Sequence, residues 1–273
     1  MSVSYNARDA AMTALAPLTA IVIACLAGGV LAIIAAAGTL ALHTRWISRL
    51  VSFAIGALLG AVFLELLPHA LEQGDTQRVM LTVLVGLLLF FLLEKLVLWR
   101  HSHDAAERLH DGVADAAFDH GIASTRPGLM IVIGNSVHNF CDGIVIAATF
   151  IADFALGTTT ALAIVAHAIP QQVGDFAVLM HSGYTRRRAF VYNLATGVAT
   201  LVGGLAGYAA LAAMQHILPT VLALAAASLL YVAVADLIPS LHRHPAPAQT
   251  ALQLLLIGVG IGLIGLVHVA LEH

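Results

Sequence analysis

The sequence predicts an all-α integral membrane protein with eight transmembrane helices, and two observations lead to this fold class. Of the 273 residues, 60% are hydrophobic and only 10% are charged. Soluble domains carry about 25% charged residues, so this chain has too little polar surface to cover a globule in water. The second observation is the recurrence of apolar stretches of about 20 residues, the length that crosses a bilayer. We therefore interpret residues 1–273 as one transmembrane domain.

Eight such stretches follow one another, and polar segments separate them. The first lacks the basic start of a signal peptide and is too long for one, so we interpret it as a span. A polar loop is predicted over residues 100–127, between the third stretch and the fourth. The predicted spans are residues 14–41, 48–71, 79–99, 128–152, 156–181, 189–214, 218–241 and 250–270.

The basic residues predict the orientation of these spans. If the N-terminus is extracytoplasmic, only Arg8 and Arg78 of the twelve basic residues lie outside. Cytoplasmic loops are enriched in lysine and arginine, so we expect both termini on the extracytoplasmic side of an inner or plasma membrane. The residues in or beside the cytoplasmic loops are Arg45, Arg49, Lys95, Arg100, Arg108, Arg126, Arg186, Arg187, Arg188 and Arg243.

The predicted loop at 100–127 combines histidines with carboxylates. Its candidate metal ligands are His101, His103, His110 and His120. Histidine with carboxylate suits first-row divalent metals at low affinity. A solvated linker whose histidines bind nothing is an equally good interpretation. The sequence leaves both open.

One pattern recurs in the second and seventh spans. FLELLPHAL, residues 63–71, and VADLIPSLH, residues 234–242, each place an acid, two apolar residues and a proline at the same spacing. Because the two spans run in opposite directions, this similarity is typical of an inverted-repeat transporter. A proline after an acid is also common where a helix ends, whatever the function of the protein. In the first interpretation Glu65, with His69 nearby, and Asp236 mark the two mouths of a pathway.

Ionisable groups occupy the middle of the fourth and fifth spans. Each span carries a polar stripe with a spacing of four residues, which places its members on one helical face. The stripes are His138 and Asp142 with the adjacent Asn139, and His167, Gln171 and Asp175. Ionisable groups inside a bilayer are costly unless paired or hydrated, so both stripes are functional candidates. Pro170 adds a backbone carbonyl that its ring frees one turn earlier.

Together the two stripes offer the ligands of a transition metal. Imidazole nitrogen and carboxylate oxygen form the usual ligand shell of Zn²⁺ and related ions. A single histidine in a span is more often an interhelical hydrogen-bond partner, but two matched stripes favour a metal site. An intramembrane metalloprotease needs H-E-x-x-H, which HAIPQ does not provide, so we expect no enzyme.

HNFCDG in the fourth span and HAIPQQVGDF in the fifth resemble the paired signatures of the ZIP family of divalent-metal transporters. The resemblance covers nearly the whole chain. It implies inverted three-helix repeats on either side of spans four and five, a 3+2+3 arrangement that moves Zn²⁺ or a similar ion into the cytoplasm. It also implies that the family's metal ligands correspond to His138, Asn139, Asp142, His167 and Gln171, with Asp175 in the G-D-F segment and Asp236 on the exit route.

The fifth-span motif departs from the family pattern in two places. Ala168 stands where a glutamate is usual, and Gln172 where a second glutamate is common. Thr200 stands where some relatives carry an acid. Relatives with two adjacent metal positions use the glutamate at the Ala168 position for the second, so we expect one metal here. The predicted ligands are His138, Asp142, His167 and Gln171, with Asn139 and Gln172 as secondary ligands.

We therefore expect transport of Zn²⁺, or of Cd²⁺, Fe²⁺ or Mn²⁺, by alternating access through a site in the middle of the membrane. The alternative is a membrane protein that binds metal without efficient flux, because Ala168 removes a carboxylate. The expected partners are the metal ion as substrate, membrane lipid and a second copy of the chain, since bundles of this kind often form homodimers. Nothing in the composition implies nucleic acid. Cys25 and Cys141 fall in different spans and predict no disulfide framework.

Overall fold

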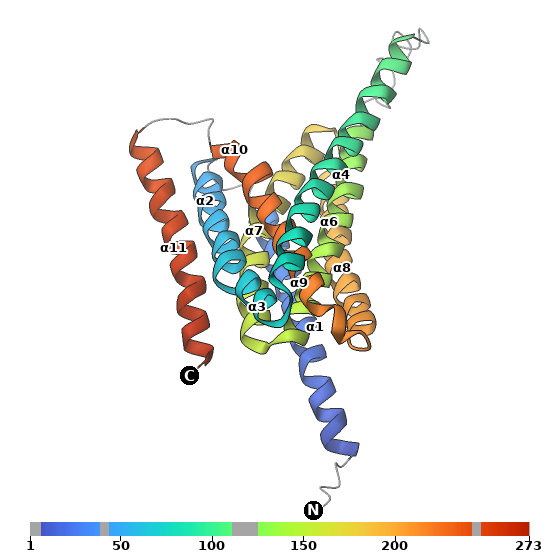
Figure 1. Ribbon diagram of the computed structural model, residues 1–273. Helices are drawn as coiled ribbons and strands as arrows, with labels where there is room; N and C mark the ends of the chain where they lie inside the picture. The colour runs from blue at the N-terminus through green and yellow to red at the C-terminus, as the bar shows by residue number, and fades with distance from the viewer. Residues whose placement is uncertain (1–6, 39–43, 111–124, 242–246, 273) are drawn as a thin grey trace, which may run out of the picture.

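The computed structural model describes residues 7–38, 44–110, 125–241 and 247–272, and long helices account for most of them (Figure 1). No strand occurs in these ranges, so the all-α prediction is confirmed. The helices are α1 (Ala7–Gly38), α2 (Thr44–Gly60), η1 (Ala61–Leu66), α3 (Leu67–Gln73), α4 (Thr76–His110), α6 (Thr125–Ala152), α7 (Phe154–His181), α8 (Arg186–Leu211), η2 (Gln215–Ile217), α9 (Leu218–Tyr231), η3 (Val232–Leu237), α10 (Ile238–Leu241) and α11 (Pro247–Glu272).

Seven segments within the described residues are long and apolar enough to cross a membrane. They are Ala16–Ala35, Trp46–Gln73, Thr76–Leu96, Phe154–His181, Arg186–Leu211, Gln215–Leu241 and Pro247–Leu271. Helix α6 is not among them, but its 28 residues extend about 42 Å, more than the roughly 30 Å of a bilayer core. The integral membrane class therefore agrees with the structure, and the eighth crossing stays a prediction.

The start of α1 and the end of α11 lie at the same end of the bundle, the lower end in Figure 1. The end of α4 and the turn between α7 and α8 lie at the opposite end. This arrangement is the one expected of an even number of crossings. Which end faces the cytoplasm stays a prediction.

Helix α4 extends beyond its predicted end. The loop between spans predicted for residues 100–127 is helical at both ends, because α4 continues to His110 and α6 begins at Thr125, whereas the apolar span within α4 ends at Leu96. Residues 101–110 include alanine, glutamate, arginine and leucine, which favour a helix, and they contain neither glycine nor proline to end it.

Two helices change from α to π geometry in the same way. Helix α2 passes through η1 into α3, and α9 passes through η3 into α10. Each π segment has six residues, carries an acid as its fifth residue and is followed by a proline two positions after its end. A proline removes a backbone donor from the helix that it enters, and a π turn is one way in which a helix adapts to such a defect. The acids are Glu65 and Asp236.

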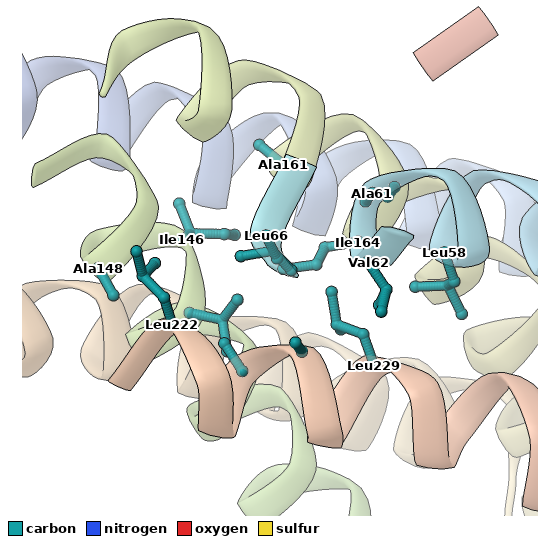
Figure 2. Packing of buried hydrophobic residues seen from close by; sticks show 14 of the residues in the cluster. Leu58, Ala61, Val62, Leu66, Ile146, Ala148, Ala161, Ile164, Leu222 and Leu229 are labelled. Carbon is teal, nitrogen blue, oxygen red and sulfur yellow. The ribbon is translucent and has the colours of Figure 1, made fainter. Parts of the chain in front are cut away.

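The hydrophobic core lies where α2, α6, α7 and α9 meet. Figure 2 shows apolar side chains of α2, of its continuation η1, and of α6, α7 and α9 gathered in one region. They include Leu58, Val62 and Leu66, Ile146 and Ala148, Ala161 and Ile164, and Leu222 and Leu229. Because lipid is as apolar as this core, the gain from packing depends mainly on close van der Waals contact between helices.

Glycines allow two pairs of helices to approach closely. A Cβ atom on Gly143 of α6 would collide with the Thr200 carbonyl of α8, and one on Gly203 of α8 would collide with the Phe140 carbonyl of α6. A Cβ atom on Gly56 of α2 would likewise collide with the Ile257 carbonyl of α11. These glycines hold α6 against α8 and α2 against α11 with backbone in contact with backbone.

Candidate metal site

The two predicted polar stripes meet between α6 and α7. His138 Nε2 lies 3.3 Å from His167 Nε2. Asp142 Oδ2 lies 3.4 Å from the first of these nitrogens and 3.3 Å from the second. In the part of the chain that the structure describes, these three side chains form the one group whose metal-ligating atoms all lie within 4.8 Å of one another. We call this group the His–Asp–His cluster.

The cluster has the dimensions of one face of a tetrahedral zinc site. Zn–N and Zn–O distances of about 2.0–2.1 Å place neighbouring ligand atoms of a tetrahedron roughly 3.3 Å apart. All three separations in the cluster are close to this value. Three protein ligands leave a fourth position open, which permits exchange at the metal.

Burial and hydrogen bonding orient the ligands of the cluster. Asp142 and His167 are buried, whereas the side chain of His138 is 23% exposed. His167 Nδ1 lies 3.4 Å from the Ala163 carbonyl oxygen. A proton on Nδ1 donates to that carbonyl and leaves the lone pair of Nε2 facing the other two ligands. His138 therefore connects a buried pair of ligands with the exterior of the bundle.

A polar network from α8 supports the cluster. Gln172 Nε2 donates to Thr196 Oγ1 at 2.9 Å, and Asn139 Nδ2 donates to the Thr196 carbonyl at 3.1 Å. Asn193 Nδ2 donates to the backbone carbonyl of Gln172 at 3.0 Å. The amide nitrogens of both predicted secondary ligands therefore bind α8, and their oxygens are the atoms left for a metal. Polar residues three apart in the apolar sixth span were the available signal for Asn193 and Thr196.

Two further predicted ligands lie along α7 after His167. Gln171 follows it by one helical turn, and its Oε1 is buried without a hydrogen-bond partner among the described residues, as a fourth ligand would be. Asp175 is a further turn along and does not belong to the His–Asp–His cluster. Asn135 of α6, a residue that the sequence pattern does not single out, lies close enough to interact with its carboxylate.

The predicted pathway residues occupy different surroundings. Glu65 is buried in η1, and its Oε2 lies 2.9 Å from Nδ1 of His268 in α11. His69 is half-buried in α3 and belongs to no metal-ligating group in the described residues. Asp236 is exposed in η3 and lies within electrostatic reach of both histidines of the cluster. Helices α3 and α10, which follow the two π segments, lie at opposite ends of the bundle (Figure 1).

The side chains of the four histidines of the predicted loop lie outside the described part of the site. His120 lies outside the described residues. His101, His103 and His110 belong to the last turns of α4, where the description covers the backbone and not the side chains. Their role as ligands stays a prediction.

The family signature agrees with this geometry. The family model described as ZIP Zinc transporter matches residues 14–128 and 100–268. The chain belongs to the ZIP family. Its ZIP relatives include proteins named Zinc transporter ZIP13 from Pongo abelii (32% identical over 232 residues), Homo sapiens (30% over 257) and Danio rerio (30% over 270). These matches cover 79%, 79% and 83% of this chain, and 65%, 69% and 77% of the relatives' own lengths.

A small cavity lies beside Ala168, the position at which the sequence predicts a departure from the family pattern. The cavity has a volume of about 20 Å³, and a buried water needs roughly 10–15 Å³. Asp142, Ala168, Gln172 and Thr200 are among the residues that line it. In the described part of the chain, neither Asp142 Oδ1 nor Gln172 Oε1 has a hydrogen-bond partner. A carboxylate at position 168 would therefore extend into a space that Asp142 and Gln172 also line.

Thr196→Val tests whether the network from α8 positions the ligands of this ZIP protein. The variant loses the hydroxyl that accepts from Gln172, so we expect zinc affinity to fall about 10-fold or more, in the range typical of outer-shell partners. Competition with a fluorescent zinc chelator in detergent measures the change. Thr82→Val, on the exposed face of α4, is the matched control. Equal affinities in the two variants would contradict a positioning role.

Proposed function

We propose that this chain transports a divalent transition metal across a membrane, with Zn²⁺ as the first candidate substrate and Cd²⁺, Fe²⁺ and Mn²⁺ as further candidates. The observation that carries the proposal is the His–Asp–His cluster, whose ligand atoms are spaced as in a tetrahedral zinc site. Membership of the ZIP family and relatives named as zinc transporters support the same substrate. Gln171 is the proposed fourth ligand.

The charge of the proposed ligand set suits transient binding. Asp142 is the carboxylate of the cluster, and two imidazoles and an amide bind as neutral ligands. A bound dication therefore keeps about one unit of positive charge. A site with fewer carboxylates holds a dication less strongly, which favours release after capture.

The proposed route crosses the bundle from one π segment to the other. Metal enters on the extracytoplasmic side near Glu65 and His69, binds at the cluster and leaves past Asp236 toward the cytoplasm. The electrostatic reach of Asp236 to the cluster supports the second half of this route. The distribution of arginine between the predicted loops supports the direction.

The proposed 3+2+3 arrangement of inverted repeats rests on how the π segments are paired. Helix α2 packs against α11, and α9 packs against α4. Glu65 in the first π segment pairs with His268 of α11, and Tyr231, directly before the second, donates a hydrogen bond to Glu94 of α4. In this arrangement α2 and α4 are the middle and last helices of the first repeat, and α9 and α11 are those of the second. The middle helix of each repeat therefore packs against the last helix of the other. Helices α1, α6, α7 and α8 pack on one another, which supports alternating access by this group moving against the rest.

Uptake by reconstituted protein tests the proposal. The full chain is placed in liposomes that contain a zinc-sensitive dye, and the entry of Zn²⁺ and Cd²⁺ is followed against protein-free liposomes. We expect saturable entry of both ions. Retention of metal by the protein without entry would overturn transport and favour the alternative, a membrane protein that binds metal without efficient flux.

Ala168→Glu is expected to create a second metal position. The new carboxylate enters the cavity beside Asp142 Oδ1, so two acidic side chains and the Gln172 oxygen can share a second ion. We expect the metal content of the desalted protein, measured by plasma mass spectrometry, to rise from about one to about two ions per chain. Ala168→Gln has a similar size without charge and serves as the control.

The same pair of variants also separates activity from impairment. Zinc entry that appears only in Ala168→Glu would show that the chain as given is a transport-impaired form. One ion per chain in Ala168→Glu would contradict the assignment of the cavity to a second metal position.

A further inference from the structure

Three consecutive arginines stand at the start of α8. Arg186, Arg187 and Arg188 are exposed, and none of them forms an ion pair with a described residue. Thr185, Arg187, Arg188, Val191 and Tyr192 line an open hollow at this point. Guanidinium groups bind phosphate through paired hydrogen bonds, so the hollow is suited to a phosphate group.

An apolar stripe continues from this hollow along α8. The stripe consists of Val191, Leu194, Val198, Val202 and Leu205, each 42–52% exposed. Its helical spacing places all five side chains below Arg187 on one face of the helix. From Val191 to Leu205 the stripe extends about 21 Å, more than half of a bilayer core of roughly 30 Å. An acyl chain in one leaflet can therefore lie along it over its whole depth.

The position of the hollow along the membrane normal identifies the ligand that it binds. Helix α8 is apolar enough to cross the membrane from Arg186 to Leu211, so its first turn lies at the level of the lipid headgroups. A ligand with a phosphate at this level and a chain below it is a phospholipid. We propose that Arg187 and Arg188 bind the headgroup of an anionic phospholipid whose acyl chain follows the apolar stripe.

The opposite face of α8 connects the proposed lipid site with the His–Asp–His cluster. Asn193 and Thr196 are buried there and hold Gln172 and Asn139 through hydrogen bonds. Tyr192, which lines the hollow, directly precedes Asn193. A lipid that fixes the first turns of α8 therefore fixes the helix that positions two side chains beside the cluster. The lipid site itself does not depend on whether the chain transports metal.

Lipid retention measured on the purified full chain tests the proposal. The protein is exchanged into mixed micelles with equal amounts of phosphatidylglycerol and phosphatidylcholine, and bound lipid is counted by native mass spectrometry. We expect a preference for phosphatidylglycerol that falls about 5-fold for each arginine replaced, and roughly 25-fold in Arg187→Gln/Arg188→Gln. Arg49→Gln/Arg78→Gln removes the same charge elsewhere and should retain the preference.

Several outcomes would overturn the lipid assignment. One is a wild-type protein without preference for the anionic lipid, and another is an equal loss in the two double variants. Competition by millimolar inorganic phosphate that displaces phosphatidylglycerol completely would show that the arginines bind free phosphate instead. A Leu194→Ser/Val198→Ser variant, which leaves the arginines intact, should weaken retention of long-chain but not of short-chain phosphatidylglycerol.

Discussion

Replacing His167 by alanine will abolish zinc uptake by the reconstituted protein. His167 is buried, and its Nε2 lies 3.3 Å both from His138 Nε2 and from Asp142 Oδ2. Without it the cluster keeps two ligands on one helix, which cannot form a face of a tetrahedral site. Loss of an outer-shell partner alone lowers metal affinity about 10–100-fold, so loss of a ligand is expected to lower it by more than roughly 100-fold.

His181→Ala is the matched control for this experiment. His181 lies on the same helix but is exposed, and its ring nitrogen contacts only the Ala177 carbonyl among the described residues. We expect uptake and zinc affinity close to those of the unchanged protein. Substantial uptake by His167→Ala, with correct folding shown by its elution and unfolding temperature, would rule out the cluster as the transport site.

Gly143→Ala will strongly destabilise the protein. The added Cβ collides with the Thr200 carbonyl and the backbone of Gly204, neither of which can move without separating α6 from α8. Overpacking typically costs about 1–3 kcal/mol, and we expect at least the upper value because backbone atoms are on both sides of the collision. Thermal unfolding in detergent, followed by intrinsic fluorescence, will show a lowered midpoint.

Gly134→Ala makes the same substitution in the same helix without a collision. A Cβ at Gly134 meets no atom within 4 Å among the described residues, so the variant should be neutral or up to about 1 kcal/mol more stable through helix propensity. Equal unfolding midpoints for the two variants would contradict the close packing of α6 on α8. In Gly143→Ala we also expect weaker zinc binding, because Asn139 is held by α8.

The helices were largely predictable because each needs only a local signal. Apolar length gave the fifth span as 156–181, and α7 runs over Phe154–His181. The exceptions arise where helix formation does not depend on apolar residues. Residues 101–110 are polar yet helical, since their intrinsic propensity continues α4 beyond the apolar stretch. The π turns were not predictable, although the prolines that accompany them were visible.

The His–Asp–His cluster was predictable because a spacing of four residues determines which side chains share a helical face. The orientation of the amide side chains beside the cluster could not be predicted from the sequence. Whether Asn139 presents its oxygen or its nitrogen toward α8 depends on the position of the Thr196 carbonyl, which is set by glycine contacts between helices distant in sequence. The pairing of Glu65 with His268 is similar, because it joins the second span to the last.

The π segments also affect how this chain should be aligned with others. A π turn holds one residue more than the α-helical turn that it replaces, so every side chain beyond it is rotated by about 100° from its α-helical direction. Removing one residue from Ala61–Leu66 or from Val232–Leu237 would restore α-helical geometry in that segment, and the turns on either side would keep their present directions. A single-residue gap inside either segment of an alignment would therefore indicate that a relative lacks the π turn, and not that the rest of its helix has shifted by one position.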